Sequence, residues 1–395
     1  MNNNITICVA DYALAADFFL RISSCDAERK YVFVNTLLSS HLKVKKRHES
    51  YLVTKLTNPK DGINSLPDNR LRETALGILS REKSLRLASS LYIKIVNIIE
   101  KYKKSRVTIM TWNGDNIIGA VMRELKKEYK DISLIFFELS NLKGKLLVDN
   151  MGVNASSSVY ASLDKIDEMP PVDPDIHQKW VKEFYESKEN PGSIPQAVKG
   201  KEINIRHIID FIYTNTVGYK LYTNNAILNR IKGKKNNVVK FDNEKNLPER
   251  FIFFPMQVST DTQIVLNSDV DNVGVLKYLV DQEALPIVTK PHPAELNFDY
   301  IYKIKNENKD KIFITNTNTY ELIKKSEKVY TINSTVGMEA MLYDKNVSFM
   351  GRSIYSKMNN EQLKKFIHLY LIDIDFFDCR NNISKNVIDK IYSRA

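Results

Sequence analysis

The sequence has little cysteine, no long apolar run and no recognisable leader, and each absence excludes a class of protein. Its three cysteines, Cys8, Cys25 and Cys379, lie far apart, and none belongs to a CxxC pair. A disulfide framework or a cysteine-based zinc site is therefore not expected. No stretch of eighteen or more apolar residues occurs, so we expect no membrane-spanning helix. The first six residues lack a basic region followed by an apolar one, which predicts a cytoplasmic protein without a signal peptide.

Metal-binding signals are also poor. The DxD triplet that holds a divalent cation on a nucleoside diphosphate has only doubtful matches, one of which is Asp373-Ile374-Asp375. This triplet lies in the C-terminal tail, which is a poor context for a substrate site. The sequence therefore predicts no metal site.

The charge of the chain is strongly positive. Its 58 Lys and Arg residues exceed its 47 Asp and Glu residues, which gives a net charge of +11 and a pI of about 9.2. An excess of positive charge favours an anionic partner: nucleic acid, an anionic membrane surface, or an acidic or phosphorylated substrate. Alternatively, much of the lysine serves solubility in a composition rich in Lys and Asn. No nucleic-acid recognition motif is present, so no nucleic-acid partner is expected.

The length of 395 residues and the pattern of apolar runs predict two α/β domains. Short apolar runs alternate with helical patterns, which is typical of βα units and parallel sheets. Strands are predicted at 5–10, 31–34, 107–111, 133–137, 251–254, 286–290, 311–314, 328–332 and 347–350. Helices are predicted at 13–21, 84–103, from 117, and at 203–231, 269–281 and 319–326. Residues 40–75 and 144–155 are predicted to be irregular loops, and the tail from about 360 to be mostly helical.

Composition suggests where the domains end. A proline-rich stretch at 168–200 predicts the end of a first α/β domain covering residues 1–200. A helical and basic linker follows at 201–250, where the run at 230–235 is rich in Lys and Arg. The second α/β domain covers 251–365, and a C-terminal tail covers 366–395.

Two late motifs predict a phosphate-binding cleft. Lys290-Pro291-His292-Pro293 follows one predicted strand, and Ser334 and Thr335 follow another and open a helix. A Ser or Thr there caps the helix, and the free backbone N–H groups attract phosphate. The flanking prolines present His292 rigidly, so its imidazole could stabilise charge on a departing phosphate. Alternatively, Ser334 and Thr335 form a plain N-cap, His292 is a structural histidine, and Lys290 is one of the lysines that are common at strand edges.

Two further polar residues are predicted to reach the same cleft. Glu339 lies five residues after Ser334 and could accept hydrogen bonds from a ribose diol. Alternatively, it is an acidic residue that the helix dipole favours. Gln257 follows the predicted strand 251–254 in a loop at the carboxyl end of that strand.

Two carboxylates are candidates for the chemistry. Asp261 follows the strand 251–254 within a loop and could act as a nucleophile or a base. Alternatively, it makes a turn or caps the segment after it. Glu138 ends the predicted strand 133–137 and suits general acid/base work. The alternative for Glu138 is a solvated residue at the end of a strand.

Together these stretches resemble the bacterial retaining β-Kdo glycosyltransferases of the capsule polysaccharide and lipopolysaccharide synthesis family. The resemblance spans about 110–340, and the order and joint presence of its motifs are more specific than any one of them. The first hundred residues and the tail add little. The matching stretches are Trp112-Asn113-Gly114, Phe137-Glu138 with Gly152-Val153-Asn154, Phe254-Pro255-Met256-Gln257-Val258 through Asp261, Lys290-Pro291-His292-Pro293, and Asn333-Ser334-Thr335-Val336-Gly337-Met338-Glu339-Ala340.

The resemblance implies a fold of the GT-B type, in which two Rossmann-like domains face each other across a cleft. Residues 1–200 would form the acceptor side and 251–365 the nucleotide-sugar side. The tail, 366–395, would cross back and pack on the N-terminal domain. The resemblance also implies CMP-β-Kdo as the donor and retention of the β configuration in the product.

The same resemblance implies roles for the candidate residues. His292, Ser334, Thr335 and Glu339 would hold CMP, with Lys290 and Gln257 beside them. Asp261 would attack the anomeric carbon, and Glu138 would be the acid/base. The second phosphate pKa of a nucleoside monophosphate is about 6, so CMP can leave with the help of His and backbone donors alone. We therefore expect no cofactor and no metal.

Other functions stay open at this point. One alternative is transfer of another CMP-activated acidic sugar, or of CDP-glycerol. Another is a non-catalytic subunit of a polysaccharide assembly or export complex. The expected partners are a CMP-sugar donor and a saccharide or lipid-linked acceptor. The basic surface could also bring the protein to the cytoplasmic face of the inner membrane as a peripheral protein.

Overall fold

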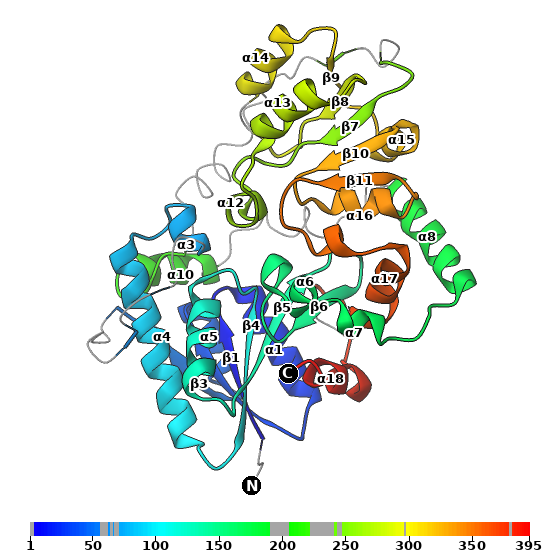
Figure 1. Cartoon of the computed structure of the whole chain (residues 1–395). Coiled ribbons are helices and arrows are strands. Elements are labelled where there is room, and N and C mark those ends of the chain that lie inside the picture. Colours follow the sequence, from blue (N-terminus) through cyan, green and yellow to red (C-terminus); the bar gives the residue numbers. More distant parts are fainter. Residues whose placement is uncertain are drawn as a thin grey trace. The chain divides into compact units, whose positions relative to one another are not determined.

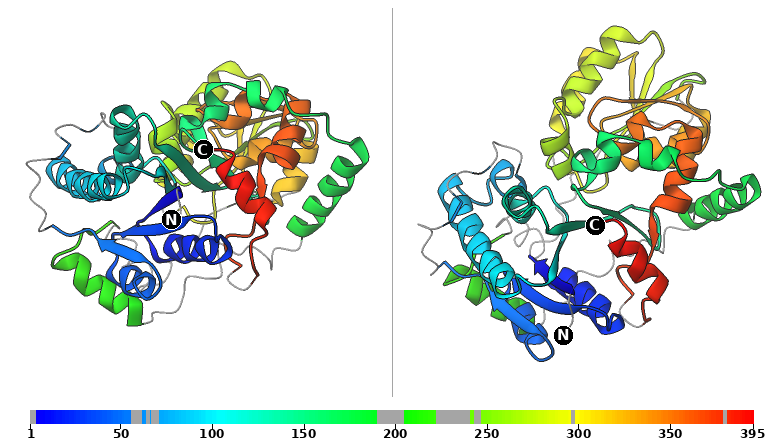
Figure 2. Two further views of the ribbon diagram at one scale, coloured as in Figure 1. Left: turned by 90° about the horizontal axis from the view of Figure 1, so that it is seen from below. Right: turned by 60° about the horizontal axis from the view of Figure 1, so that its bottom comes forward.

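Two β-sheets flanked by helices make up the described part of the chain (Figures 1 and 2). The computed structural model of the protein describes residues 4–55, 62–63, 66, 71–189, 205–221, 241–242, 247–295, 298–378 and 381–395.

The chain divides into two compact units. Unit 1 comprises Met1–Ser162, Lys182–Arg230 and Phe366–Ala395, and unit 2 comprises Leu163–Val181 and Ile231–Lys365. This division differs from the predicted domains in two places. Residues 163–181 belong to unit 2 instead of the N-terminal domain, and residues 205–221 belong to unit 1 instead of a separate linker. The basic run at 230–235 lies outside the described residues.

The sheet of unit 1 has seven strands in the order β12-β6-β5-β4-β1-β2-β3. Strands β1 to β5 run parallel, whereas β6 runs antiparallel to both β5 and β12. The central strands are almost wholly buried, because they consist of apolar runs that helices cover on both faces. The strands are β1 (Asn4–Ala10), β2 (Lys30–Asn35), β3 (Glu49–Leu52), β4 (Arg106–Trp112), β5 (Ser133–Leu139), β6 (Lys145–Asp149) and β12 (Ile372–Asp373).

The helices of unit 1 bury apolar faces on this sheet. In α4, Leu87, Leu91, Ile95 and Ile98 form the buried face, which confirms the amphipathic helix predicted at 84–103. The helices are α1 (Ala13–Cys25), α2 (Leu38–Val44), α3 (Arg72–Ala75), α4 (Arg81–Lys101), α5 (Ile117–Glu128), α6 (Ser158–Ala161), α10 (Ile205–Asn215) and α18 (Lys385–Tyr392), with single turns η2 (Asn154–Ser156) and η6 (Phe366–Tyr370). Helix α8 (Pro174–Glu189) contributes residues to both units.

Several local predictions for unit 1 were wrong. The segment 40–75, predicted to be irregular, contains β3 and α3, and the segment 144–155, predicted to be a loop, contains β6. Both strands are short, and β6 pairs with β5 on one side and with β12, from the far end of the chain, on the other. The helix predicted at 203–231 ends at Asn215, and residues 222–231 lie outside the described part. The tail is only partly helical because it contains β12.

The sheet of unit 2 has five strands, all parallel, in the order β11-β10-β7-β8-β9. All five were predicted to within two residues of their ends. The strands are β7 (Ile252–Pro255), β8 (Ile287–Lys290), β9 (Ile312–Ile314), β10 (Lys328–Thr331) and β11 (Asn346–Phe349). The helices are α7 (Asp164–Asp167), α12 (Thr262–Asn267), α13 (Asn272–Gln282), α14 (Asp299–Glu307), α15 (Thr319–Lys325), α16 (Thr335–Met341) and α17 (Asn360–Lys365), with the turn η5 (Ile354–Lys357).

Both sheets reverse their strand order beside their first strand. β1 has β2 and β3 on one side and β4 and β5 on the other, and β7 is flanked in the same way by β8 and β9 and by β10 and β11. This topology confirms the predicted α/β class with two Rossmann-like parts. In such sheets, ligands bind beyond the carboxyl ends of the two strands at the reversal. These ends follow β1 and β4 in unit 1, and β7 and β10 in unit 2.

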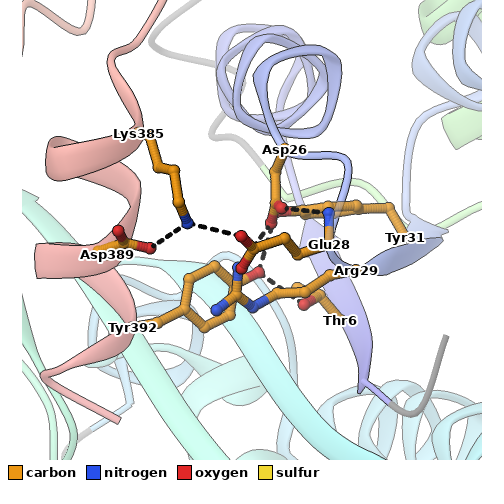
Figure 3. Close-up of polar contacts among 8 residues, drawn as sticks. All are labelled: Thr6, Asp26, Glu28, Arg29, Tyr31, Lys385, Asp389 and Tyr392. Carbon is orange, nitrogen blue, oxygen red and sulfur yellow. Dashed lines mark hydrogen bonds and ion pairs between the residues drawn. The ribbon is translucent and has the colours of Figure 1, made fainter.

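The C-terminal segment returns to unit 1, as predicted. Ile372 pairs with Leu146 of β6, and α18 packs Ile388 and Ile391 into the core that α1 and the sheet form. At the edge of α18, Lys385 Nζ lies 2.6 Å from Glu28 Oε1 (Figure 3). The helix is therefore held by apolar burial and by surface charge.

A chain of hydroxyl groups joins the end of α18 to β1 and β2 (Figure 3). The Tyr392 hydroxyl lies 2.6 Å from Thr6 Oγ1 and 2.9 Å from the Tyr31 hydroxyl. Tyr31 donates its own proton to Asp26 Oδ2 at 2.6 Å. Tyr392 therefore donates to Tyr31 and accepts from Thr6, because each hydroxyl has one proton. The guanidinium of Arg29 lies 3.6 Å from the centre of the Tyr392 ring.

Removing the Tyr392 hydroxyl is expected to destabilise unit 1. In Tyr392→Phe the fully buried Thr6 hydroxyl loses its partner, which costs about 1–3 kcal/mol of unfolding free energy. Urea unfolding followed by circular dichroism measures this. The control is Tyr278→Phe on α13, whose side chain is exposed, and a change within about 0.5 kcal/mol is expected there. Equal stability of the two variants would show that the hydroxyl chain does not hold α18.

Candidate functional site

A pair of side-chain amides joins the carboxyl ends of β7 and β10 in unit 2. Gln257 Nε2 donates to Asn333 Oδ1 at 2.9 Å, and the Asn333 backbone N–H donates to Gln257 Oε1 at 3.1 Å. The backbone of Gln257 is held in turn by Asn272, which accepts from its N–H at 3.2 Å and donates to its carbonyl at 2.7 Å. The buried Gln257 therefore links the loops that follow β7 and β10, the two strands at the reversal. Its predicted contact with CMP stays a prediction.

Further hydrogen bonds bring the neighbouring loops to the same edge of the sheet. Asn333 Nδ2 donates to the Gln263 carbonyl in α12 at 2.8 Å. Ser259 donates from its N–H and its hydroxyl to Glu295 Oε2, both at 2.7 Å, which ties the loop after β7 to the loop after β8. The structure therefore places five of the predicted residues in or beside loops at one edge of the sheet: Gln257, Asp261, Lys290, His292 and Ser334.

Ser334 is the N-cap of α16, and Thr335 is the first residue of that helix. Ser334 Oγ accepts from the Val336 N–H at 3.2 Å. This bond leaves the hydroxyl proton of Ser334 available to donate to a ligand. A Cβ on Gly337 would lie 2.5 Å from the Phe349 ring, so glycine is required for α16 to lie this close to the sheet. The capping alternative is thus observed, and it is compatible with the predicted phosphate contact.

His292 is exposed in the loop after β8, and its ring is oriented by its own backbone. Its Nδ1 accepts from the Ala294 N–H at 3.0 Å. Because a nitrogen that accepts carries no proton, the neutral ring carries its proton on Nε2. His292 therefore presents an N–H donor even when uncharged. Lys290 Nζ donates to the Thr317 carbonyl at 2.8 Å, and burial lowers the pKa of this amine.

Asp261 is the N-cap of α12. Its Oδ1 accepts from the Gln263 N–H at 2.9 Å, and its own N–H donates to the Val258 carbonyl at 2.8 Å. The capping alternative is therefore observed, and a half-buried carboxylate lies at the edge of the sheet beside the loops described above. A cap uses one carboxylate oxygen, so the predicted nucleophilic role stays a prediction.

Glu339 lies deeper than the other predicted residues. It is buried within α16, at 6% exposure. Burial raises the pKa of the Tyr355 phenol, and the charge of Glu339 raises it further. The structure thus places Glu339 in the packed interior of unit 2, and its contact with a ribose stays a prediction.

In unit 1, Asn113 orients the carboxylate of Glu138 at the strand reversal. Asn113 follows β4 with a φ of 61°, a left-handed conformation that asparagine tolerates better than most residues. Its Nδ2 donates to Glu138 Oε2 at 2.7 Å, and its Oδ1 accepts from the Gly114 and Asp115 N–H groups at 2.6 and 2.8 Å. The Leu139 N–H donates to Glu138 Oε1 at 3.1 Å. Both oxygens of Glu138 are therefore fixed.

The environment of Glu138 raises its pKa to about 7. Burial among protein atoms is the main cause, although part of the side chain is solvent-accessible, and the charge of Asp115 raises the pKa further. The hydrogen bonds from Leu139 and Asn113 oppose this rise. A carboxyl group with a pKa near neutrality can both accept and return a proton at physiological pH, which is what general acid/base catalysis requires.

Two further carboxyl groups, those of Asp11 and Glu73, lie at the same edge of the sheet of unit 1. Asp11 directly follows β1, and its Oδ2 accepts from Asn116 Nδ2 at 3.3 Å, while its buried Oδ1 has no hydrogen-bond partner among the described residues. Glu73 is buried and accepts from the Ile117 N–H at 3.0 Å. Burial, and then the charge of Asp11, raise the pKa of Glu73 to about 7. The charge of Arg72 lowers the pKa of both groups.

Glu73 is expected to make stability depend on pH. A folded pKa of about 7, above the unfolded value of 4.5, means that the folded state binds more protons between these values. The unfolding free energy should therefore fall as pH rises from 5 to 8, by about 2 kcal/mol from this group alone. Glu73→Gln mimics the protonated acid and should remove this part of the slope. Urea unfolding at pH 5 and pH 8 measures it, and an unchanged slope in the variant would contradict the assignment.

Three residues of these sites were not singled out from the sequence. Asp11 directly follows β1, and Asn333 lies two residues after the end of β10, so the rule that identified Glu138 could have found them. Glu73 lies in a segment that was predicted to be irregular, and no signal in the sequence marks it. The structure does not bring together any group of three His, Cys, Asp or Glu side chains that could hold a metal, as far as the described residues go.

Comparison with known proteins places the chain in a family. A family model described as "Capsule polysaccharide biosynthesis protein" matches residues 118–359. The match covers more than half of the chain and includes every site residue predicted from the sequence. The chain belongs to the capsule polysaccharide biosynthesis family. Asp11 and Glu73 lie outside the matched range. Within the described ranges, no helix is long and apolar enough to cross a membrane.

Individual relatives are distant. Protein FixF of Sinorhizobium fredii (strain NBRC 101917 / NGR234) is 26% identical over 267 residues, which cover 65% of this chain and 52% of FixF. The chain thus matches about half the length of that relative. The Thermosulfurimonas dismutans KpsC beta Kdo 2,7 transferase has 14% identity and a TM-score of 0.47, covering 98% of this chain and 99% of that one. The KpsC beta Kdo 2,4 transferase has 16% identity and a TM-score of 0.43, covering 73% and 88%.

Proposed function

We propose that this member of the capsule polysaccharide biosynthesis family is a glycosyltransferase. It would move Kdo from CMP-β-Kdo to a saccharide or glycolipid acceptor with retention of the β configuration, without a metal ion. The observation that carries the proposal is the set of donors gathered at the strand reversal of unit 2. The motif resemblance and the family support the choice of substrate class.

The donor side needs groups that stabilise a leaving phosphate. His292 offers an Nε2–H donor in its neutral form, and Ser334 keeps its hydroxyl proton for a ligand. Lys290 is near the same edge, at the end of β8. Hydrogen-bond donors of this kind stabilise the charge that develops on a phosphate as it departs. A nucleoside monophosphate with a second pKa of about 6 can leave with this help alone.

Two successive displacements at the anomeric carbon would give retention, because each displacement inverts the configuration. In the first, the Asp261 carboxylate forms a bond to that carbon while the bond to the CMP phosphate breaks, and CMP takes the electron pair. In the second, Glu138 removes the proton of an acceptor hydroxyl, which attacks the carbon and releases Asp261. The pKa of about 7 at Glu138 supports its role as the base.

Binding of CMP tests the donor side. Isothermal titration should show CMP binding to the wild-type chain, and His292→Ala and Ser334→Ala should each weaken it by about 1.5–3 kcal/mol, the range for hydrogen bonds to charged groups. Ser393→Ala near the C-terminus is the control, because its hydroxyl donates to the Lys390 carbonyl of its own helix turn. Unchanged CMP affinity in both variants would refute the assignment of His292 and Ser334 to the CMP site.

A further inference from the structure

Helix α10 carries an apolar stripe that faces away from unit 1. Ile205, Ile208, Phe211 and Ile212 are 67%, 50%, 51% and 59% exposed. At 100° per residue they fall within an arc of about 120° on one side of the helix. Exposed apolar groupings of this kind mark sites of protein or membrane contact.

The opposite side of α10 holds the helix on unit 1. Asp210 accepts from the Ser39 N–H at 2.8 Å and from its hydroxyl at 2.5 Å, at the start of α2. The buried Tyr213 donates its hydroxyl proton to the Val53 carbonyl. Figure 2 shows α10, in green, beside α2, in blue, in agreement with their packing. The stripe is therefore presented by an anchored helix.

Exposed basic residues lie on α10 and after its neighbour α2. His207 is exposed on α10. Arg206, also exposed, lies outside the arc of the stripe and pairs with Asp17 at 3.7 Å. The neighbouring helix α2 is followed by three exposed basic residues, Lys45, Lys46 and Arg47. The one acidic residue of α10, Asp210, is bonded to Ser39. The described surface of these two helices thus combines large apolar side chains with positive charge.

We propose that α10 docks this protein on an anionic lipid surface. Apolar side chains beside basic ones are the combination that binds helices to the boundary of an anionic bilayer, by burying apolar area and attracting lipid headgroups. A second copy of the chain fits less well. A symmetric interface would place the same patch on both partners, so like charges would face each other. None of the residues of this surface is among those proposed for transfer, so its test can fail while the proposed function stands.

Vesicle flotation tests the docking surface. The full chain is mixed with vesicles of phosphatidylcholine alone or with phosphatidylglycerol added. We expect binding to the anionic vesicles only, with weaker binding at high salt because exposed charges are screened. Ile208→Ser with Ile212→Ser should lower the partition coefficient at least tenfold. The matched control is Ile176→Ser on α8, which is also 59% exposed and should bind as the wild type does.

The outcomes distinguish a lipid surface from a second copy of the chain as the partner that the stripe of α10 contacts. Wild-type chain that fails to float, or the double variant floating as well as wild type, would overturn the proposal. A dimer in size-exclusion chromatography with light scattering that the double variant abolishes would also overturn it, in favour of contact between copies. Circular dichroism spectra should be the same for all variants, and transfer to a water-soluble acceptor should be unchanged in the double variant.

Discussion

Replacing Glu138 by glutamine is expected to lower kcat for sugar transfer by about 10²–10⁴-fold, the usual contribution of a general acid or base. The amide cannot take the proton of the acceptor hydroxyl. Asn113 and Leu139 each donate to one carboxylate oxygen, and the single amide oxygen of glutamine can still accept from one of them, so one hydrogen bond remains to orient the side chain. Steady-state kinetics with CMP-β-Kdo and an acceptor measure the loss.

The pH dependence makes the Glu138 prediction specific. A base must be ionised to accept a proton, so kcat/KM should rise with pH and level off above about 7. The variant should lose this rise. Glu124→Gln is the control, because that residue lies on the exposed side of α5 and pairs with Lys127. A Glu138→Gln variant with wild-type kcat, or with the same pH profile, would remove Glu138 from the mechanism.

Replacing Asp261 by asparagine is expected to abolish transfer, with a loss of at least about 10³-fold in kcat, because an amide cannot serve as the nucleophile. Asparagine caps helices as well as aspartate does, so α12 should keep its cap from residue 261 to the Gln263 N–H. Stability should therefore stay within about 0.5 kcal/mol of wild type. The change isolates the chemistry of the carboxylate from its capping role.

A matched control separates nucleophile from cap. Asp271 caps α13 in the same way, with its Oδ1 accepting from the Gly274 N–H at 2.8 Å. Asp271→Asn should retain transfer. In Glu138→Gln supplied with donor, the sugar should remain bonded to the chain, and intact mass should increase by one sugar residue that peptide mapping places at position 261. Asp261→Asn with near wild-type activity would refute the covalent role.

The parts of the fold that local pattern decides were predictable. β7, β8 and β10 are short runs rich in apolar residues, polar residues end β8 and β10 and follow β7 at Gln257, and helices come after them. Because the ends of parallel strands meet at one edge, the residues after them had to be neighbours. What the pattern could not show is how the loops are tied. The amide pair of Gln257 and Asn333 depends on tertiary geometry.

The failures have a common physical cause. β6 pairs with β5 and also with a strand from residues 372–373, and no local signal reports this second, distant partner. Glu73 sits in an irregular-looking segment, and its raised pKa follows from burial that only the folded chain creates. The apolar period of α10 predicted a helix, but the period alone does not tell which side of the helix meets the core. Long-range burial decided each of these.

The most direct test of the account is the product of one reaction. The purified chain is incubated with CMP-β-Kdo and candidate saccharide and glycolipid acceptors, without added metal and with a chelator. Transfer of Kdo with retention predicts release of CMP and a product heavier than the acceptor by one Kdo residue, with the β anomer shown by NMR. No release of CMP with any acceptor, or a product with the α configuration, would contradict it.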